Sequence, residues 1–387
     1  MNIPLSNPDI SDFDRQAVLD VLNTPALSLG PRLPEFEKVF ARTLGSRHAV
    51  AVNSGTSALH LCVKAAEIGE GDEVITTPFS FVASANCALF ERAWPVFVDI
   101  EEETYNINPF GIEDAITSRT RAILPVHVFG RPCEMDPILL LARHYGLYVI
   151  EDACEAIGAT YGGKQVGTFG HTAAFAFYPN KQITTGEGGM IVTDESAVAA
   201  LCRSWRNQGR SETGAWLQHE RLGYNYRLSD INCALGLAQL KQLDEILAMR
   251  NAVAGKYTSL LKDRVPEVIP PAPAARHSRN SWFVYVVRLR EEFTRSDRDA
   301  VLEHLRAEGI GCNNYFSPIH LQPFYQEMFG YRKGCFPITE RVADRTIALP
   351  FFNRLGDAQI EVVCNALAQA VSRLRHAVFS LSQASVS

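Results

Sequence analysis

The stretch FAFYPNKQITTGEGG, Phe175–Gly189, places a lysine, Lys181, between an apolar run and a glycine-rich turn. An earlier apolar run, Leu147–Ile150, ends in the acidic pair Glu151–Asp152. A desolvated lysine favours its neutral form and can condense with an aldehyde, while an aspartate facing a pyridine nitrogen keeps that nitrogen protonated. The two motifs together predict pyridoxal phosphate chemistry, with Lys181 bonded to the cofactor aldehyde and Asp152 facing the ring nitrogen.

Each of these residues also has an ordinary structural interpretation. A lysine before a glycine-rich turn is commonly a solvated surface residue. An aspartate that follows a strand is commonly the N-cap of a helix, because its carboxylate accepts hydrogen bonds from the first N–H groups. The cofactor hypothesis for Lys181 and Asp152 therefore needs support from other segments.

A second segment, VNSGTSALHL at Val52–Leu61, runs from a short apolar strand through a polar turn into a helical pattern. N–H groups at the start of a helix, with hydroxyls beside them, bind phosphate through hydrogen bonds and the helix dipole. Gly55, Thr56 and Ser57 are therefore predicted to hold the cofactor phosphate. The alternative is an ordinary serine or threonine N-cap without a ligand.

From about residue 48 to 195, short β-rich runs alternate with helical patterns such as Thr56–Ala66 and Pro137–Tyr145. Several of the runs are apolar throughout, which is typical of parallel strands buried on both faces. The runs are Ala49–Val52, Glu73–Thr76, Val96–Asp99, Ala122–Val126, Leu147–Ile150, Ala173–Phe177 and Met190–Val192. They predict an α/β fold with a mainly parallel sheet, whose active-site loops gather at one edge.

The rest of the chain predicts a smaller α/β unit. A long helical stretch, Asp230–Leu260, leads to the proline cluster Ile269–Ala274. A strand at Trp282–Leu289 and helices at Asp297–Glu308 and Ile360–Val371 then follow. We therefore expect a large cofactor-binding domain at 1–250, which includes the N-terminal segment, and a small C-terminal domain at 251–387.

Composition excludes several classes of protein. The 387 residues are 47% hydrophobic with a formal net charge of −6 and no long basic run, so neither nucleic acid nor a membrane is expected as a partner. The N-terminus resembles no signal peptide, and the chain contains no run of about 18 apolar residues, which predicts a cytoplasmic protein. Nine cysteines without a CxxC pair suit reduced thiols, and ten histidines without HExxH spacing predict no metal.

Several motifs in this order resemble the DegT/DnrJ/StrS family of fold-type I aminotransferases, which act on nucleotide-linked keto-sugars. The resemblance spans nearly the whole chain. Its motifs are LGPRLPEFEKVFA (Leu29–Ala41), NSGTSALHL, GDEVITTPFSFVASAN (Gly71–Asn86), EDACEAIGA (Glu151–Ala159), FYPNKQITTGEGGMIVTD (Phe177–Asp194), GYNYRLSDINCALGLAQL (Gly223–Leu240) and PIHLQPFY (Pro318–Tyr325).

The resemblance adds cofactor contacts and shows two departures. It implies that Phe81 stacks on the cofactor ring, and the alternative is that Phe79 and Phe81 are core or strand residues. Glu155 stands where glutamine or histidine usually approaches the ring oxygen, and some 4-aminotransferases resembling perosamine synthases have glutamate there. Ala176 replaces a serine that usually binds the phosphate, so one phosphate hydroxyl is missing.

The resemblance also implies a partner and a substrate loop. In the family, the residue matching Asn225 reaches into the neighbouring subunit's active site, where it would help to hold the cofactor phosphate. This implies a homodimer with its active site at the interface; the alternative is a turn asparagine. Ser28 and Gly30 resemble residues of a substrate-facing loop. Tyr315 and His320 are candidates for contacting the diphosphate or the sugar hydroxyls, or else are packing residues.

The reaction implied by the resemblance is transfer of an amino group, usually from glutamate, to a keto-sugar linked to a nucleoside diphosphate. The motifs favour a 4-keto-6-deoxy hexose for surface polysaccharide, such as O-antigen, or another glycoconjugate. A 3-keto-sugar aminotransferase uses nearly the same motifs. A sugar deoxygenase would lack the lysine at 181, and a non-catalytic cofactor-binding sensor usually adds a DNA-binding module, which is not evident here.

Overall fold

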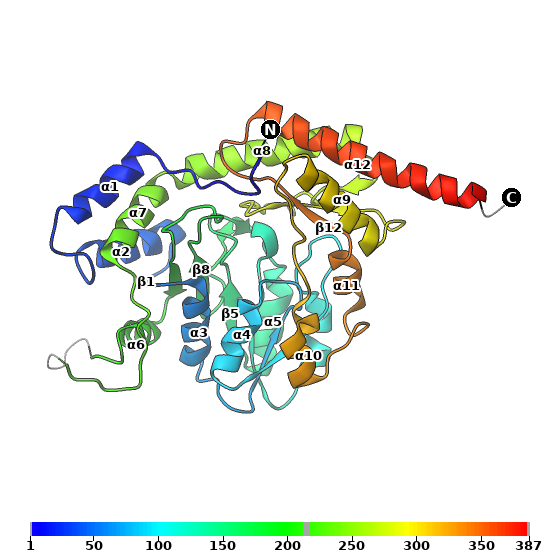
Figure 1. The fold of residues 1–387 in the computed structure, drawn as a ribbon. Helices are drawn as coiled ribbons and strands as arrows, with labels where there is room; N and C mark the ends of the chain where they lie inside the picture. Colours follow the sequence, from blue (N-terminus) through cyan, green and yellow to red (C-terminus); the bar gives the residue numbers. More distant parts are fainter. Residues whose placement is uncertain (1, 212–216, 385–387) are drawn as a thin grey trace.

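The computed structural model describes residues 2–211 and 217–384. Within these residues the larger sheet has seven strands in the order β1-β9-β8-β5-β4-β2-β3 (Figure 1). The strands are β1 His48–Val52, β2 Glu73–Thr76, β3 Trp94–Phe97, β4 Thr120–Ile123, β5 Tyr148–Asp152, β8 Thr172–Ala176 and β9 Gly189–Thr193. Strand β9 is antiparallel to both neighbours, and the other pairs in this sheet are parallel. The mainly parallel sheet predicted from the sequence is confirmed.

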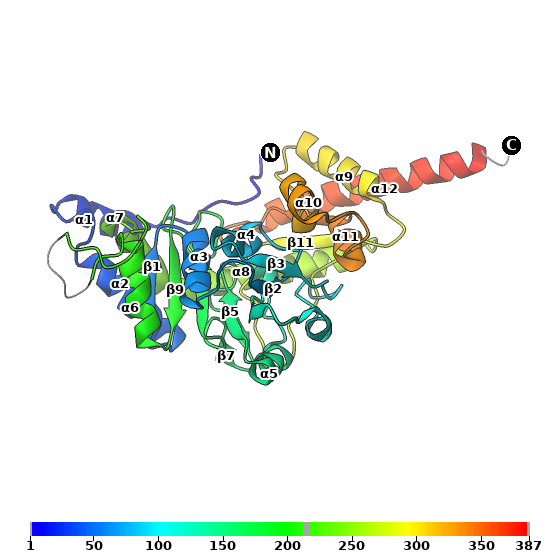
Figure 2. The ribbon, with the colours of Figure 1, turned by 90° about the horizontal axis from the view of Figure 1, so that it is seen from below.

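Helices cover both faces of this sheet, as Figures 1 and 2 show. Alternate residues of a strand point to opposite faces, so Val50 and Val52 pack with α3, α4 and α6. Ala49 and Ala51 face the other way and pack with α2 and α7, and α5 covers the same face farther along the sheet. The bounds are α2 Arg32–Leu44, α3 Gly55–Ala65, α4 Ala83–Phe90, α5 Met135–Tyr145, α6 Ser196–Arg206 and α7 Asp230–Lys241.

Helix α2 illustrates how the sequence sets these elements. Its buried residues Leu33, Phe36, Phe40 and Leu44 recur at helical spacing and form one apolar stripe. The helix ends at Gly45, which takes a left-handed conformation with φ of 77° that glycine adopts without steric cost. The neighbouring helix α1, Asp12–Leu22, packs against α7.

The second half of the chain builds a smaller antiparallel sheet in the order β10-β11-β12. Its core includes Tyr257, Tyr285 and Val363, and Ile3 from the N-terminal segment joins it. The elements are α8 Leu243–Arg264, β10 Val268–Ile269, β11 Tyr285–Leu289, α9 Arg295–Ala307, α10 Pro323–Phe329, α11 Pro337–Ala343, β12 Thr346–Leu349 and α12 Asp357–Ala384, with a separate ribbon of β6 Thr160–Tyr161 and β7 Lys164–Gln165. Along the described residues, no helix has both the length and the apolar composition needed to cross a bilayer.

Helix α8 joins the two cores. Leu243 and Ile246, in its first half, pack in the core of the large sheet. Val253 and Leu261, in its second half, pack in the core of the small sheet. The predicted domain boundary at residue 250 falls inside this helix, and the division into two domains stays a prediction.

Several predicted elements differ in extent from the observed ones, and two of the differences have a clear cause in the backbone. The helical stretch predicted for 230–260 breaks at Gln242 into α7 and α8. The strand predicted from Trp282 starts only at Tyr285, because Trp282 has a positive φ of 53° that a β-strand does not allow. The apolar composition of this stretch does not indicate that the backbone changes direction at Trp282.

We expect the substitution Gly255→Ala to stabilise the protein. Gly255 is exposed in the middle of α8, and a Cβ there would meet no atom within 4 Å. Alanine restricts the unfolded chain, so the free energy of unfolding should rise by about 0.5–1 kcal/mol. Urea unfolding followed by circular dichroism measures the change. Gly158→Ala should have the opposite effect, because the φ of Gly158 is +79° and a Cβ there would overlap Leu247. A lower urea midpoint for Gly255→Ala than for the unchanged protein would contradict the prediction.

Candidate active site

The ends of three strands and the start of a fourth meet at one edge of the large sheet. Gly189 at the start of β9 pairs with Val52 at the end of β1 and with Ala176 at the end of β8. Asp152 at the end of β5 pairs with Ala174. A cavity of about 510 Å³ lies here, outside the carboxyl ends of parallel strands, which is where α/β sheets bind ligands. Its lining includes the predicted site residues Gly55, Thr56, Phe81, Asp152, Glu155, Lys181 and Tyr315.

Lys181 lies in the loop between β8 and β9, and its side chain is only 13% exposed. Its Nζ lies 3.6 Å from Glu155 Oε1 and 3.8 Å from the ring centre of Phe283. The amine therefore faces the cavity between a carboxylate and an aromatic face, and it is not a solvated surface lysine.

Asp152 is buried at the end of β5, where two donors hold its carboxylate. The hydroxyl of Ser84 donates to Oδ2 over 2.7 Å, and the N–H of Cys154 donates to Oδ1 over 3.1 Å. Ser84 is itself 2.8 Å from the hydroxyl of Ser80. Within the described chain no α-helix begins directly after Asp152, so the alternative helix N-cap role is not observed.

Helix α3 begins at the cavity with Ser54 as its N-cap. The N–H of Ser57 donates to Ser54 Oγ over 3.1 Å, and the Ser57 hydroxyl donates to Asn53 Oδ1 over 2.7 Å. Ser57 is thus buried in the cap, whereas Ser54, Gly55 and Thr56 line the cavity. The first N–H groups of a helix lack intrahelical acceptors and carry the positive end of its dipole, so this end suits an anion.

Glu155 stands beside the lysine, buried in the cavity wall. Its Oε2 accepts the N–H of Phe129 over 2.8 Å, and its Oε1 faces Lys181. Burial raises the pKa of Glu155, and the nearby Lys181 opposes that shift. The position therefore holds an acidic group in direct contact with the amine.

The aromatic residues divide between core and cavity. Phe79 is fully buried in the core, whereas Phe81 is 62% exposed and forms part of the cavity wall. Tyr315 also lines the cavity, and its ring stacks on Phe316 with 5.0 Å between centroids. His320 does not line it: the ring is fully buried, with Nε2 3.0 Å from Glu340 Oε1. This placement corresponds to a packing role for His320.

The remaining predicted residues lie elsewhere in the single chain. Asn225 is exposed, and its carbonyl accepts a 3.5 Å hydrogen bond from the Asn53 side chain. Ser28 is exposed and forms a β-bridge with Ser229. The N–H of Gly30 donates to Asp230 Oδ1 over 3.0 Å. Roles for Ser28, Gly30 and Asn225 at the site stay predictions.

Comparison with known proteins identifies the family to which the chain belongs. The sequence model of the DegT/DnrJ/EryC1/StrS aminotransferase family matches residues 8–368. The chain belongs to this family. The GDP-perosamine synthase of Caulobacter vibrioides is 41% identical over 370 residues, which are 95% of this chain and 98% of that protein.

Two further relatives support the same family assignment. The spore coat polysaccharide biosynthesis protein SpsC of Bacillus subtilis is 39% identical over 379 residues, 95% of this chain and 97% of that protein. The solved structure of DesV from S. venezuelae matches with a TM-score of 0.88 at 34% identity, covering 95% of this chain and 98% of that one. The protein is therefore a pyridoxal phosphate-dependent aminotransferase of sugar or polysaccharide biosynthesis, as predicted.

The cavity of this aminotransferase fits the cofactor. Lys181 offers an amine for the aldehyde, Asp152 a buried carboxylate for the ring nitrogen, and the start of α3 offers N–H groups for the phosphate. Gly55 is part of that cradle: a Cβ there would lie 2.6 Å from Ala176 Cβ and 3.0 Å from Cys154 Sγ. The backbone at Gly55 can lie this close to Ala176 and Cys154 only because the residue has no side chain.

Sequence reasoning missed several residues of the site, and two of them contact Asp152 and Lys181 directly. Ser84 holds the Asp152 carboxylate, and it lies in the motif Gly71–Asn86 that carries the family resemblance, so a signal was present. Phe283 contacts Lys181 from the second half of the chain. Nothing in its local sequence indicates that contact, because the fold alone brings residues 181 and 283 together.

The substitution Gly189→Ala should damage the phosphate end of this cavity. A Cβ at Gly189 would overlap the carbonyl oxygen of Ser54 and lie 2.9 Å from the nitrogen of Gly55. Overpacking of this kind should lower the free energy of unfolding by about 1–3 kcal/mol and weaken cofactor retention. Urea unfolding and dialysis of the bound cofactor measure both effects. Gly69→Ala is the control, because a Cβ there meets nothing within 4 Å; equal behaviour of the two variants would refute the prediction.

Proposed function

We propose that this aminotransferase moves an amino group from glutamate to the keto carbon of a 4-keto-6-deoxy hexose linked to a nucleoside diphosphate. The amino-sugar nucleotide would supply surface polysaccharide or another glycoconjugate, and the reaction would take place in the cytoplasm. The cavity that gathers Lys181, Asp152 and the start of α3 supports the proposal most directly. The similarity to GDP-perosamine synthase supports the choice of sugar.

Each residue of the cavity has a separate role in the proposed reaction. Pyridoxal phosphate, when bound, supplies an aldehyde that takes up amino nitrogen and a ring that withdraws electrons from the adjacent C–H bond. Asp152 keeps a proton on the ring nitrogen, because its buried carboxylate favours a positive neighbour. Lys181, once its amine is free, removes the proton from Cα of the amino donor. Glu155 orients that amine from 3.6 Å away, and Phe81 excludes water from one side of the cavity.

The proposal includes a homodimer in which Asn225 completes the partner's cavity. The rings of Tyr224 and Tyr226 stack with centroids 4.8 Å apart, and both contact the ring of His60. These contacts anchor the residues on both sides of Asn225, which is itself exposed. An exposed polar residue on an anchored segment suits a role in a neighbouring subunit.

A subunit-mixing experiment is expected to restore activity. Lys181→Ala and Asn225→Ala homodimers should each be nearly inactive. If Asn225 acts across the interface, a mixed dimer contains one site with both residues intact, so random mixing should recover about a quarter of wild-type activity. Unfolding and refolding the two variants together, followed by a transamination assay, measures the recovery. Activity that stays at the level of the separate variants would place Asn225 outside the partner's site.

The substrate assignment is tested by supplying glutamate with GDP-, UDP- and dTDP-linked keto-sugars and detecting products by mass spectrometry. Amination of a 4-keto-6-deoxy hexose is expected, with consumption of glutamate. Amination restricted to 3-keto-sugars would overturn the proposed position. Turnover with another amino acid and none with glutamate would overturn the proposed donor.

A further inference from the structure

Arg250, on α8, is a buried cation whose partners are neutral. Its Nε donates to the carbonyl of Trp282 over 2.7 Å and one terminal nitrogen to the carbonyl of Phe283 over 2.7 Å. The other terminal nitrogen donates to Asn353 Oδ1 over 2.8 Å, and the guanidinium lies 5.0 Å from the ring centre of Phe351. Among the described residues no carboxylate forms an ion pair with Arg250, and burial lowers the pKa of Arg250 to about 9.

A buried charge without a counter-ion is unfavourable, so its retention points to a specific task. The backbone that it holds is also strained. Trp282 has a φ of 53°, a left-handed conformation that is uncommon for bulky side chains and that persists only where the surroundings enforce it. Arg250 supplies that enforcement, because its planar fork binds two consecutive carbonyls, at Trp282 and Phe283.

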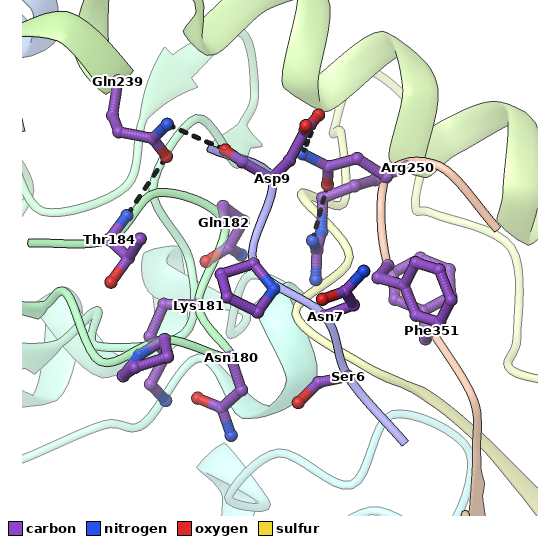
Figure 3. Close-up of a pocket in the computed structure, with 14 residues that line it drawn as sticks. Ser6, Asn7, Asp9, Asn180, Lys181, Gln182, Thr184, Gln239, Arg250 and Phe351 are labelled. Carbon is purple, nitrogen blue, oxygen red and sulfur yellow. Dashed lines mark hydrogen bonds between the residues drawn. The ribbon is translucent and has the colours of Figure 1, made fainter. Parts of the chain in front are cut away.

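The strained segment leads directly to the catalytic cavity. The ring of Phe283 faces Nζ of Lys181 at 3.8 Å, while its N–H donates to the carbonyl of Phe129 over 3.2 Å. Gln182, next to Lys181, donates to Ser281 Oγ over 2.9 Å. Figure 3 shows Lys181, Gln182 and Arg250 around the same small pocket, which the N-terminal segment with Asn7 also lines.

We propose that Arg250 is a positioning residue that fixes the ring of Phe283 against the amine of Lys181. The ring and the carboxylate of Glu155 then approach Nζ as two separate contacts and set the direction of the amine in the cavity. The proposal rests on the role of Lys181 as the residue that captures the cofactor aldehyde. Helix α8, which packs in both cores, therefore helps to orient the amine through Arg250.

The test measures how fast Lys181 captures the cofactor. The full chain, freed of cofactor, is mixed with pyridoxal phosphate, and the visible absorbance of covalent capture is followed by stopped flow. Phe283→Leu and Arg250→Met should each slow capture about tenfold, because the amine of Lys181 is then no longer held in the direction from which it reaches the aldehyde. Phe283→Tyr keeps the ring and should stay within about twofold of wild type. Arg264→Met, an exposed arginine on the same helix, is the control and should capture at the wild-type rate.

The double variant distinguishes action through Phe283 from an independent role. If Arg250 acts through the ring, Arg250→Met with Phe283→Leu should be no slower than Phe283→Leu alone. A double variant whose capture is slowed by the product of the two single effects would overturn the proposal. A Phe283→Tyr variant that captures the cofactor as slowly as Phe283→Leu would also overturn it. If Arg250→Met fails to fold, the two Phe283 variants still decide whether the ring is needed. Borohydride reduction and peptide mass spectrometry identify the labelled lysine: label elsewhere refutes the role of Lys181, whereas label on Lys181 at unchanged rates refutes only the positioning role.

Discussion

Replacing Lys181 with alanine is expected to lower transamination by about 10⁴-fold or more, because one amine both captures the cofactor and carries the proton. The purified variant should also lack the visible absorbance of covalently held cofactor. The folded structure should persist, since among the described residues the side chain loses one ion pair, with Glu155, and one ring contact, with Phe283. Steady-state kinetics with glutamate and the absorption spectrum measure the two effects.

A matched control separates this effect from a general loss of lysine charge. Lys262 is an exposed lysine on α8, and Lys262→Ala should retain both activity and absorbance. A Lys181→Ala enzyme that keeps covalently bound cofactor would show that another amine performs the capture. The assignment of Asp152 would then have to be reconsidered, because Asp152 and Lys181 are assigned as a pair around one cofactor ring.

Local sequence signals predicted the elements that depend on nearest neighbours. The apolar runs ending at Val52 and Asp152 became strands whose ends meet at the cavity, because parallel strands bring their carboxyl ends to one edge. The polar turn at Gly55 and Thr56 became the start of α3 for the same local reason. Of the three residues predicted to bind the phosphate, Gly55 and Thr56 line the cavity, whereas the hydroxyl of Ser57 donates to Asn53 within the cap.

Features that depend on distant packing could not be predicted in this way. Phe283 reaches Lys181 across 102 positions of sequence only because Phe283 and residues of the small sheet pack in the same core as strands of the large sheet. In the sequence, Arg250 resembles any other arginine of a helical pattern. Only the structure shows that its buried side chain binds two backbone carbonyls. His320, within a recognisable motif, packs against Glu340 rather than lining the cavity. Motifs therefore predicted many of the side chains that line the cavity, whereas the contacts of Phe283 and Arg250 depend on the fold.

Converting Asp152 to asparagine tests the other end of the cofactor and should lower kcat by about 10²–10⁴-fold with a smaller effect on KM. The amide has nearly the same shape, and its oxygen can still accept the N–H of Cys154. The amide nitrogen can donate to Ser84, whose hydroxyl can turn toward Ser80 2.8 Å away, so stability should change little. What is lost is the negative charge that holds a proton on the ring nitrogen.

Asp194 offers a closely matched control for this change. It follows β9, and its Oδ1 accepts the N–H of Arg47 over 2.8 Å and the hydroxyl of Ser46 over 3.1 Å, a donor set like that of Asp152. Because β9 is antiparallel to its neighbours, Asp194 lies at the opposite edge of the sheet from the cavity. Asp194→Asn should leave kcat unchanged, and Ser84→Ala should lower it by about tenfold, since one charge-assisted hydrogen bond to the carboxylate is lost. Equal activities of the Asp152 and Asp194 variants would mean that the charge at Asp152 has no part in the reaction.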